Sequence, residues 1–181
     1  LRCIGVVTDK AEDKRRPDIE LARGRIIAHR EGASWNLREA GLCDKDWRIA
    51  LSDHARIRRV MDGAPTDGPA DARIGRTKCE VATGRSWTAR LLPFGCLVYY
   101  RPGTGKVGPC DAKTLPGLYL GPEITSEWRY RGNSQIADLA ALGKDQMSIV
   151  VTKEIVVPNS IVFPLAAALR AAEERGVVVT D

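Results

Sequence analysis

The sequence predicts an α+β protein in which an N-terminal helical segment is followed by a small β-barrel and a C-terminal helix. Apolar residues recur every three or four positions before residue 61, whereas the apolar period changes to two after residue 77. A stretch rich in Gly and Pro separates these two patterns. With 181 residues, the chain is long enough to bury a hydrophobic core without the support of disulfides.

Two helices are expected in the N-terminal half. The first begins at Pro17 or Asp18 and ends at Gly41, which suits the residue that follows a helix. The second begins after Asp44 and stops at Gly63. The arginines of the second helix lie off its apolar stripe, so we expect them to face outward. That stripe consists of Trp47, Ala50, Leu51, His54, Ile57 and Met61.

Residues 62–76 have no apolar face and are expected to be a linker. This linker divides the chain into a helical segment at 1–61, a β domain at 77–163, and a C-terminal helix and tail at 164–181. The last helix is expected to start at Pro164.

The β domain is predicted from several short strands with Gly and Pro turns between them, a pattern that favours a small barrel. Apolar residues on both faces of the first strand indicate burial on both sides. The expected strands cover residues 91–100, 118–120, 128–130 and 149–157.

The charge is compatible with a polyanion partner. The chain carries 28 Lys and Arg against 23 Asp and Glu, a net charge of +5. Residues 1–90 hold 19 basic and 14 acidic groups, whereas residues 91–181 hold 9 of each. A positively charged half suits nucleic acid, and a solvated basic surface is the alternative interpretation.

Several classes of protein are excluded. No apolar run is long enough to span a bilayer, and the first residues lack the features of a signal peptide, so we expect a nuclear or cytoplasmic location without secretion or membrane contact. The missing initiator Met suggests a fragment of a longer protein. Five cysteines without a Cys-x-x-Cys pair do not support a zinc site. The run at 103–108 is no phosphate-binding loop, because Tyr100 and Val107 stand where that motif needs Gly and Ser or Thr.

A more specific pattern lies in residues 92–121. An apolar strand with Phe94-Gly95-Cys96 at its centre is followed by a basic loop, and then by the sequence Gly-Leu-Tyr-Leu-Gly at 117–121. This pattern resembles the SH3-like domain that follows the integrase core in Copia-type retrotransposon polyproteins. The glycines would permit the sharp bends of a tight barrel.

The resemblance extends over most of residues 19–170. Thr77-Lys78-Cys79-Glu80 is similar to a Thr-Pro-aromatic-Glu segment of the family, with Lys and Cys as replacements. Ala40-Gly41-Leu42 with the following Trp47 resembles the end of the integrase core, and residues 152–170 resemble the stretch that closes this region in divergent members. The resemblance therefore implies that 1–61 is the end of an RNase H-like core and that 77–163 is SH3-like.

The resemblance also implies catalytic chemistry in the parent protein. Integrase cores use two Asp and one Glu to hold two Mg²⁺ or Mn²⁺ ions for phosphoryl transfer. Glu20 is the candidate for that Glu, and a solvated Glu in the first turn of a helix is the alternative. The two Asp would lie upstream of residue 1, so we expect no cofactor, no strand transfer and no nuclease activity in this fragment alone.

For the function of this chain we therefore expect binding of double-stranded DNA without sequence specificity in support of DNA integration, with other integrase subunits as further potential partners. Basic residues near the barrel loops and on the second helix would contact phosphates, although each of them is also compatible with a plain surface charge. The candidates are Arg56, Arg58, Arg59, Arg101, Lys106, Lys113, Arg129 and Arg131.

The alternative is a non-enzymatic protein-interaction module or a decayed transposon remnant. SH3-like barrels often bind peptides through aromatic grooves. Tyr99, Tyr100, Tyr119 and Trp128 could line such a groove, although core packing is the alternative for most of them. The net charge of zero in residues 91–181 favours this interpretation.

Overall fold

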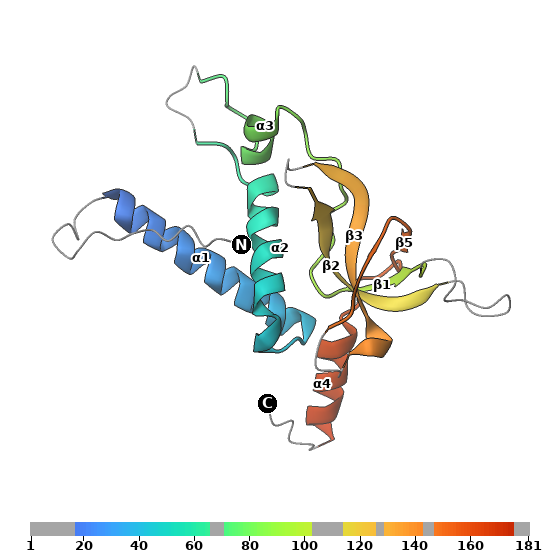
Figure 1. The fold of residues 1–181 in the computed structure, drawn as a ribbon. Coiled ribbons are helices and arrows are strands. Elements are labelled where there is room, and N and C mark those ends of the chain that lie inside the picture. Colours follow the sequence, from blue (N-terminus) through green and yellow to red (C-terminus); the bar gives the residue numbers. More distant parts are fainter. Residues whose placement is uncertain (1–16, 66–70, 103–113, 126–128, 143–146, 176–181) are drawn as a thin grey trace.

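The computed structural model describes residues 17–65, 71–102, 114–125, 129–142 and 147–175. Within these ranges the chain is α+β, with N-terminal helices, one five-stranded antiparallel sheet and a C-terminal helix (Figure 1). This confirms the predicted fold class in outline. No helix in these ranges is long and apolar enough to cross a membrane.

Helix α1 (Pro17–Ala40) and helix α2 (Trp47–Met61) pack against each other, and a short 3-10 helix at Asp44–Asp46 joins them. Gly41 ends α1 in the left-handed conformation (φ 71°), as the sequence predicts. Gly32 of α1 lies directly under the imidazole of His54, so any larger residue there would collide with it. The rings of His54 and His29 lie 5.5 Å apart, and His54 therefore packs between the two helices as expected.

The buried face of α2 differs from the predicted stripe. Ala50, Asp53 and Val60 are buried, whereas Met61, a member of the predicted stripe, is 64% exposed. Contacts of α2 with both α1 and the sheet explain the difference, because a helix between two elements buries more than one stripe. Arg56, which we expected to face outward, is largely buried on the side of the sheet, with only 13% of its side chain exposed.

The ends of the predicted linker are hydrogen-bonded to each other. Gly63 and Thr77 form an antiparallel bridge, and the Lys78 N–H donates to the Asp62 carbonyl at 3.0 Å. The Lys78 ammonium also lies 2.7 Å from the Asp62 carboxylate. This loop therefore returns to its starting point and places helix α3 (Lys78–Thr83) beside the end of α2 (Figure 1).

The sheet has the strand order β4-β3-β2-β1-β5, and every neighbouring pair is antiparallel. The first strand is shorter than expected, and its alternating burial shows one exposed and one buried face. The strand predicted at 118–120 is longer, and the stretch predicted as 149–157 divides into two. The strands are β1 (Leu97–Tyr100), β2 (Leu115–Ile124), β3 (Tyr130–Asp138), β4 (Ile149–Thr152) and β5 (Ile155–Val156).

The predicted barrel is not closed. Strands β4 and β5 form the two edges of the sheet and do not pair with each other. Only Lys153 and Glu154 separate them in the chain, so the sheet must curl strongly for its two edges to approach. Strand β5 has only two residues, and both of them pair with β1, so β5 offers little backbone to β4 and the sheet stays open between its two edge strands.

The helices and the sheet share one hydrophobic core. Ala33, Leu37 and Ala40 of α1 and Ala50 of α2 pack with residues of the sheet, among them Leu118 of β2. A second cluster lies within the curled sheet around Val98, Tyr100, Tyr119 and Ile136. Helix α4 (Pro164–Glu174) begins with Pro at its N-terminus, as predicted, and packs on the end of α1.

Side chains of helix α2 lie close to strand β2 at Gly121. This glycine has a positive φ of 123° and lies at a register shift between β2 and β3. A Cβ atom there would lie 2.5 Å from both Asp53 Oδ1 and Arg56 Nη1. The absence of a side chain at Gly121 is therefore what allows α2 to lie against the sheet.

Replacing Gly121 by Ala is expected to destabilise the fold by more than about 1 kcal/mol, because the change combines backbone strain with a collision against α2. Gly132→Ala is the matched control, since Gly132 also has a positive φ (88°) but has open space around the Cβ position. Urea unfolding of both variants measures the difference. Equal destabilisation of the two variants would contradict a tight contact between α2 and Gly121.

Candidate nucleic-acid interface

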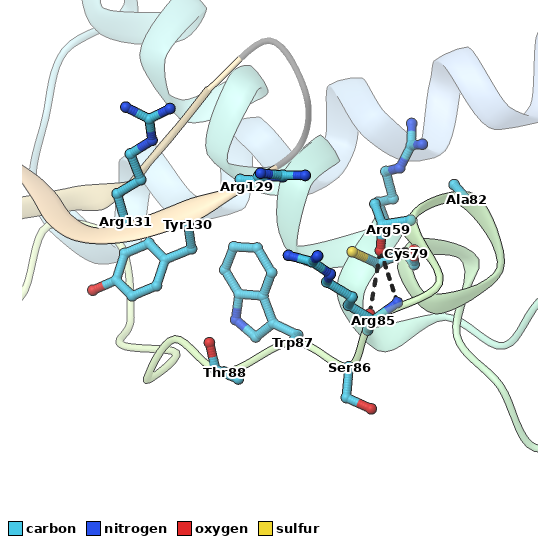
Figure 2. A pocket seen from close by; sticks show the side chains of 11 residues that line it. Arg59, Cys79, Ala82, Arg85, Ser86, Trp87, Thr88, Arg129, Tyr130 and Arg131 are labelled. Atoms are coloured by element: carbon cyan, nitrogen blue, oxygen red, sulfur yellow. Dashed lines mark hydrogen bonds between the residues drawn. The ribbon is translucent and has the colours of Figure 1, made fainter.

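A pocket of about 860 Å³ lies where the end of α2, helix α3, the segment that follows α3 and the start of β3 come together (Figure 2). Its lining combines arginines and aromatic residues with small polar side chains. The residues that line it are Arg59, Cys79, Ala82, Thr83, Arg85, Ser86, Trp87, Thr88, Arg129, Tyr130 and Arg131.

Helix α3 and its ends set the course of the chain along one wall of this pocket. Thr77 and Glu80 form a capping box: the Thr77 hydroxyl accepts from the Glu80 N–H, and the Glu80 carboxylate accepts from the Thr77 N–H. Gly84 ends the helix in the left-handed conformation (φ 70°). The Thr83 hydroxyl bonds to backbone groups of Cys79 and Arg85, which holds the segment after the helix in place.

Four arginines from three different parts of the chain meet at the pocket. Arg59 comes from α2, Arg85 from the segment after α3, and Arg129 and Arg131 flank Tyr130 at the start of β3. Among the residues that the structure describes, the lining contains no Asp or Glu. Four guanidinium groups around one described lining give this concave surface a positive charge.

Two aromatic rings form the apolar part of the same surface. The ring centroids of Trp87 and Tyr130 lie 5.8 Å apart, and the rings are tilted by 36°. In Figure 2 the indole lies at the centre of the pocket, with Tyr130 on one side and Arg85 on the other. The indole N–H of Trp87 is buried and has no hydrogen-bond partner among the described residues.

This arrangement can bind anions and planar groups. Guanidinium groups match the geometry of phosphate oxygens, and aromatic faces accept bases or other planar groups. Within the described ranges, no three His, Cys, Asp or Glu residues gather where they could hold a metal ion. The residues present there do not fit a two-metal centre, and we derive no metal-dependent step from them.

Three of the predicted DNA-binding residues, Arg59, Arg129 and Arg131, lie together in this pocket. Arg58 pairs instead with Asp62 at 3.2 Å on the exposed side of α2. Arg101 lies at the end of β1, outside the pocket lining, with its Nη1 3.4 Å from the Glu154 carboxylate.

The remaining predicted site residues have other surroundings. Lys106 and Lys113 lie outside the described residues. Glu20, the candidate integrase carboxylate, is exposed on α1, and no cluster of potential metal ligands includes it in the described part of the chain. Arg56 lies at the contact between α2 and the sheet, outside the pocket lining.

Sequence reasoning did not identify Arg85, Trp87 or Tyr130 as site residues. Basic and aromatic residues alternate in both Arg85-Ser86-Trp87 and Arg129-Tyr130-Arg131, and this interleaving is a signal that could have found them. Only the fold brings these two segments to one pocket, because they lie more than forty residues apart in the chain.

Asp53 and Arg56 form a largely buried pair within α2, one helical turn before Arg59 of the pocket. Asp53 is 1% exposed, and its Oδ1 lies 3.8 Å from Arg56 Nη1. Neither carboxylate oxygen has a hydrogen-bond partner among the described residues. Burial raises the pKa of Asp53 to about 7, and the nearby charge of Arg56 opposes this increase without cancelling it.

Comparisons with known proteins identified no relative: no protein-family model, no curated protein and no solved structure matches the chain.

The buried Asp53 carboxyl predicts a specific dependence of stability on pH. The folded-state pKa of about 7 lies above the ordinary value of 3.8. Between these two pH values the folded chain therefore keeps a proton that the unfolded chain has released. The free energy of unfolding then falls as pH rises, by at most about 1.4 kcal/mol per pH unit. Asp53→Asn, which imitates the protonated carboxyl, should remove this slope.

The measurement is urea unfolding of the wild-type chain and the variant at several pH values between about 5 and 8. Asp53→Asn should approach the wild-type stability at the acidic end and exceed it at the alkaline end. Asp44→Asn, at an exposed position, is the control that should retain the wild-type slope. Parallel pH profiles for the wild-type chain and Asp53→Asn would contradict a raised pKa at Asp53.

Proposed function

We propose that this chain is a non-catalytic DNA-binding module that contacts the phosphate backbone of double-stranded DNA without sequence specificity. The convergence of Arg59, Arg85, Arg129 and Arg131 on one pocket, without an acidic residue in its described lining, is the observation that carries the proposal. Contacts between arginines and phosphates supply affinity and orientation but carry no sequence information.

Arginine suits this role better than lysine would. Its planar guanidinium donates two parallel hydrogen bonds to one phosphate, and it also stacks on aromatic rings. Arg85, Arg129 and Arg131 are exposed, so their guanidinium groups can reach a ligand from solvent. The surrounding fold keeps the segments that carry them in place, since Gly84 and the capping box hold one segment and pairing with β2 holds the other.

We also propose that the sheet is an SH3-like domain of a Copia-type retrotransposon integrase. Strands β1 to β4 pair in the order in which they occur in the chain, and β5 returns to pair with β1. This connectivity supports an SH3-like fold, although the sheet is open. In this proposal α1 and α2 represent the end of the integrase core. Mg²⁺ or Mn²⁺ and the other catalytic carboxylates belong to the parent protein, and further integrase subunits are potential partners.

One observation favours the alternative of a protein-interaction module. The edge strands carry exposed apolar side chains: Ile149 and Val151 on β4 are 45% and 46% exposed, and Val156 on β5 is 58% exposed. An open, apolar edge can accept a strand from a partner protein. The predicted aromatic groove is not supported, because Tyr100 and Tyr119 are buried in the core and Trp128 lies outside the described residues.

Replacing Arg85, Arg129 and Arg131 together by Ala tests the proposal. The triple variant should bind a generic duplex about tenfold or more weakly than the wild-type chain, because up to three arginine–phosphate interactions are removed. The dependence of log affinity on log salt should also become shallower, by about 0.9 for each phosphate that is no longer neutralised. Fluorescence anisotropy between about 50 and 200 mM salt measures both quantities.

The matched control is the triple variant of Arg23, Arg48 and Arg170, which are exposed and lie outside the pocket. It removes the same charge and should bind almost as well as the wild-type chain. Equal weakening in both triple variants would show a diffuse charge effect and contradict a defined interface. No binding by the wild-type chain at the lower salt concentration would favour the protein-interaction alternative.

A further inference from the structure

We infer that the pocket accepts an unpaired base, so that the preferred substrate is DNA with a short single-stranded extension at its end rather than a blunt duplex. This inference rests on the proposed DNA-binding function and adds a substrate class to it. The juxtaposition that carries it is that of the aromatic pair Trp87 and Tyr130 with four arginines in the lining of one pocket.

Contacts with phosphates alone do not require a cavity. A duplex presents its phosphates on a convex surface, which exposed arginines can reach without any cavity. The pocket is instead a hollow of about 860 Å³, within the size range of sites that enclose small molecules. A base that leaves its stack can enter such a hollow, whereas a paired base cannot.

The aromatic rings provide a platform for stacking. Trp87 and Tyr130 are each partly exposed. Their rings are tilted relative to each other, so they do not form a parallel stack in which the two facing sides cover each other. Stacking of a base on such a ring tolerates every sequence, because each base has a π-face. This tolerance agrees with the proposed lack of sequence specificity.

The unpartnered indole N–H of Trp87 is a second, independent observation. A buried donor without an acceptor is unfavourable, and native structures rarely keep one without a reason. An acceptor on a bound nucleotide would satisfy this donor, which the described residues leave without a partner.

The arginines lie in the same pocket as the aromatic rings. The rings suit the base of a nucleotide, and the guanidinium groups suit its phosphates. Arg129 and Arg131 stand on either side of Tyr130 in the chain, and Arg85 lies two residues before Trp87. Each aromatic residue thus has an arginine close to it in sequence, and the aromatic residues and these arginines line the same cavity. A base on the rings would leave its 5′ and 3′ phosphates within reach of these guanidinium groups.

The decisive experiment varies the DNA and uses the wild-type chain. Anisotropy is measured on a blunt duplex, on the same duplex with a few unpaired thymidines at one end, and on the same duplex with abasic sugars in place of those thymidines. The two extended duplexes carry equal numbers of phosphates. The thymidine extension should bind about fivefold or more tightly than the blunt duplex, and the abasic extension should lack this preference.

Each result has a distinct meaning. Equal affinity for blunt and extended duplexes overturns the base pocket but leaves the proposed DNA binding intact. A preference that the abasic extension retains shows that flexible phosphates and not bases are recognised, which also overturns it. Absence of binding to all three DNAs overturns the proposed function itself.

Variants of the chain assign the effect to Trp87. Trp87→Ala should abolish the difference in affinity between the thymidine extension and the blunt duplex, and Trp87→Phe should keep part of this difference because it retains a ring. Trp35→Ala is the control, since Trp35 is 64% exposed on α1 and does not line the pocket. Full preference in a folded Trp87→Ala variant, as verified by circular dichroism, overturns the role of Trp87.

Discussion

The close contact between helix α2 and strand β2 at Gly121 is the constraint on which the rest of the structure depends. Asp53 and Arg56 occupy the space that a side chain at Gly121 would need. This contact lets the helices share a core with the sheet, and it turns one face of α2 toward the strands. Arg59 lies one helical turn beyond Arg56, so the same contact brings its guanidinium to the pocket.

The pocket illustrates why net charge is a weak guide to a binding surface. Residues 91–181 carry equal numbers of acidic and basic groups, yet this half supplies Arg129 and Arg131 to the pocket. Other cations form local pairs, as Arg58 does with Asp62 and Arg101 with Glu154. In the proposed function, the local concentration of charge around a concave surface would determine binding, and the average over a segment would not.

The open sheet and the pocket lie in different parts of the fold and support different kinds of partner. The edges formed by β4 and β5 offer backbone groups and apolar side chains, which suit a protein strand. The pocket between α2, α3 and β3 offers cations and aromatic rings, which suit a nucleic acid. A chain with both surfaces could hold DNA while its sheet edge contacts another protein, so the two proposals are compatible in one molecule.

The sequence by itself determined the elements whose signals are local. Periodicity and end signals predicted α1 with Gly41 at its end, the later helix from Pro164 and the change from helices to strands. The capping signature from Thr77 to Glu80 was also present in the sequence, although it was not used to predict α3. Tertiary structure alone decided the burial of Asp53 and Arg56, the open edge of the sheet and the meeting of Trp87 with Tyr130. The reason is that periodicity reports which side of one element is apolar, whereas these features depend on which distant element packs against that side.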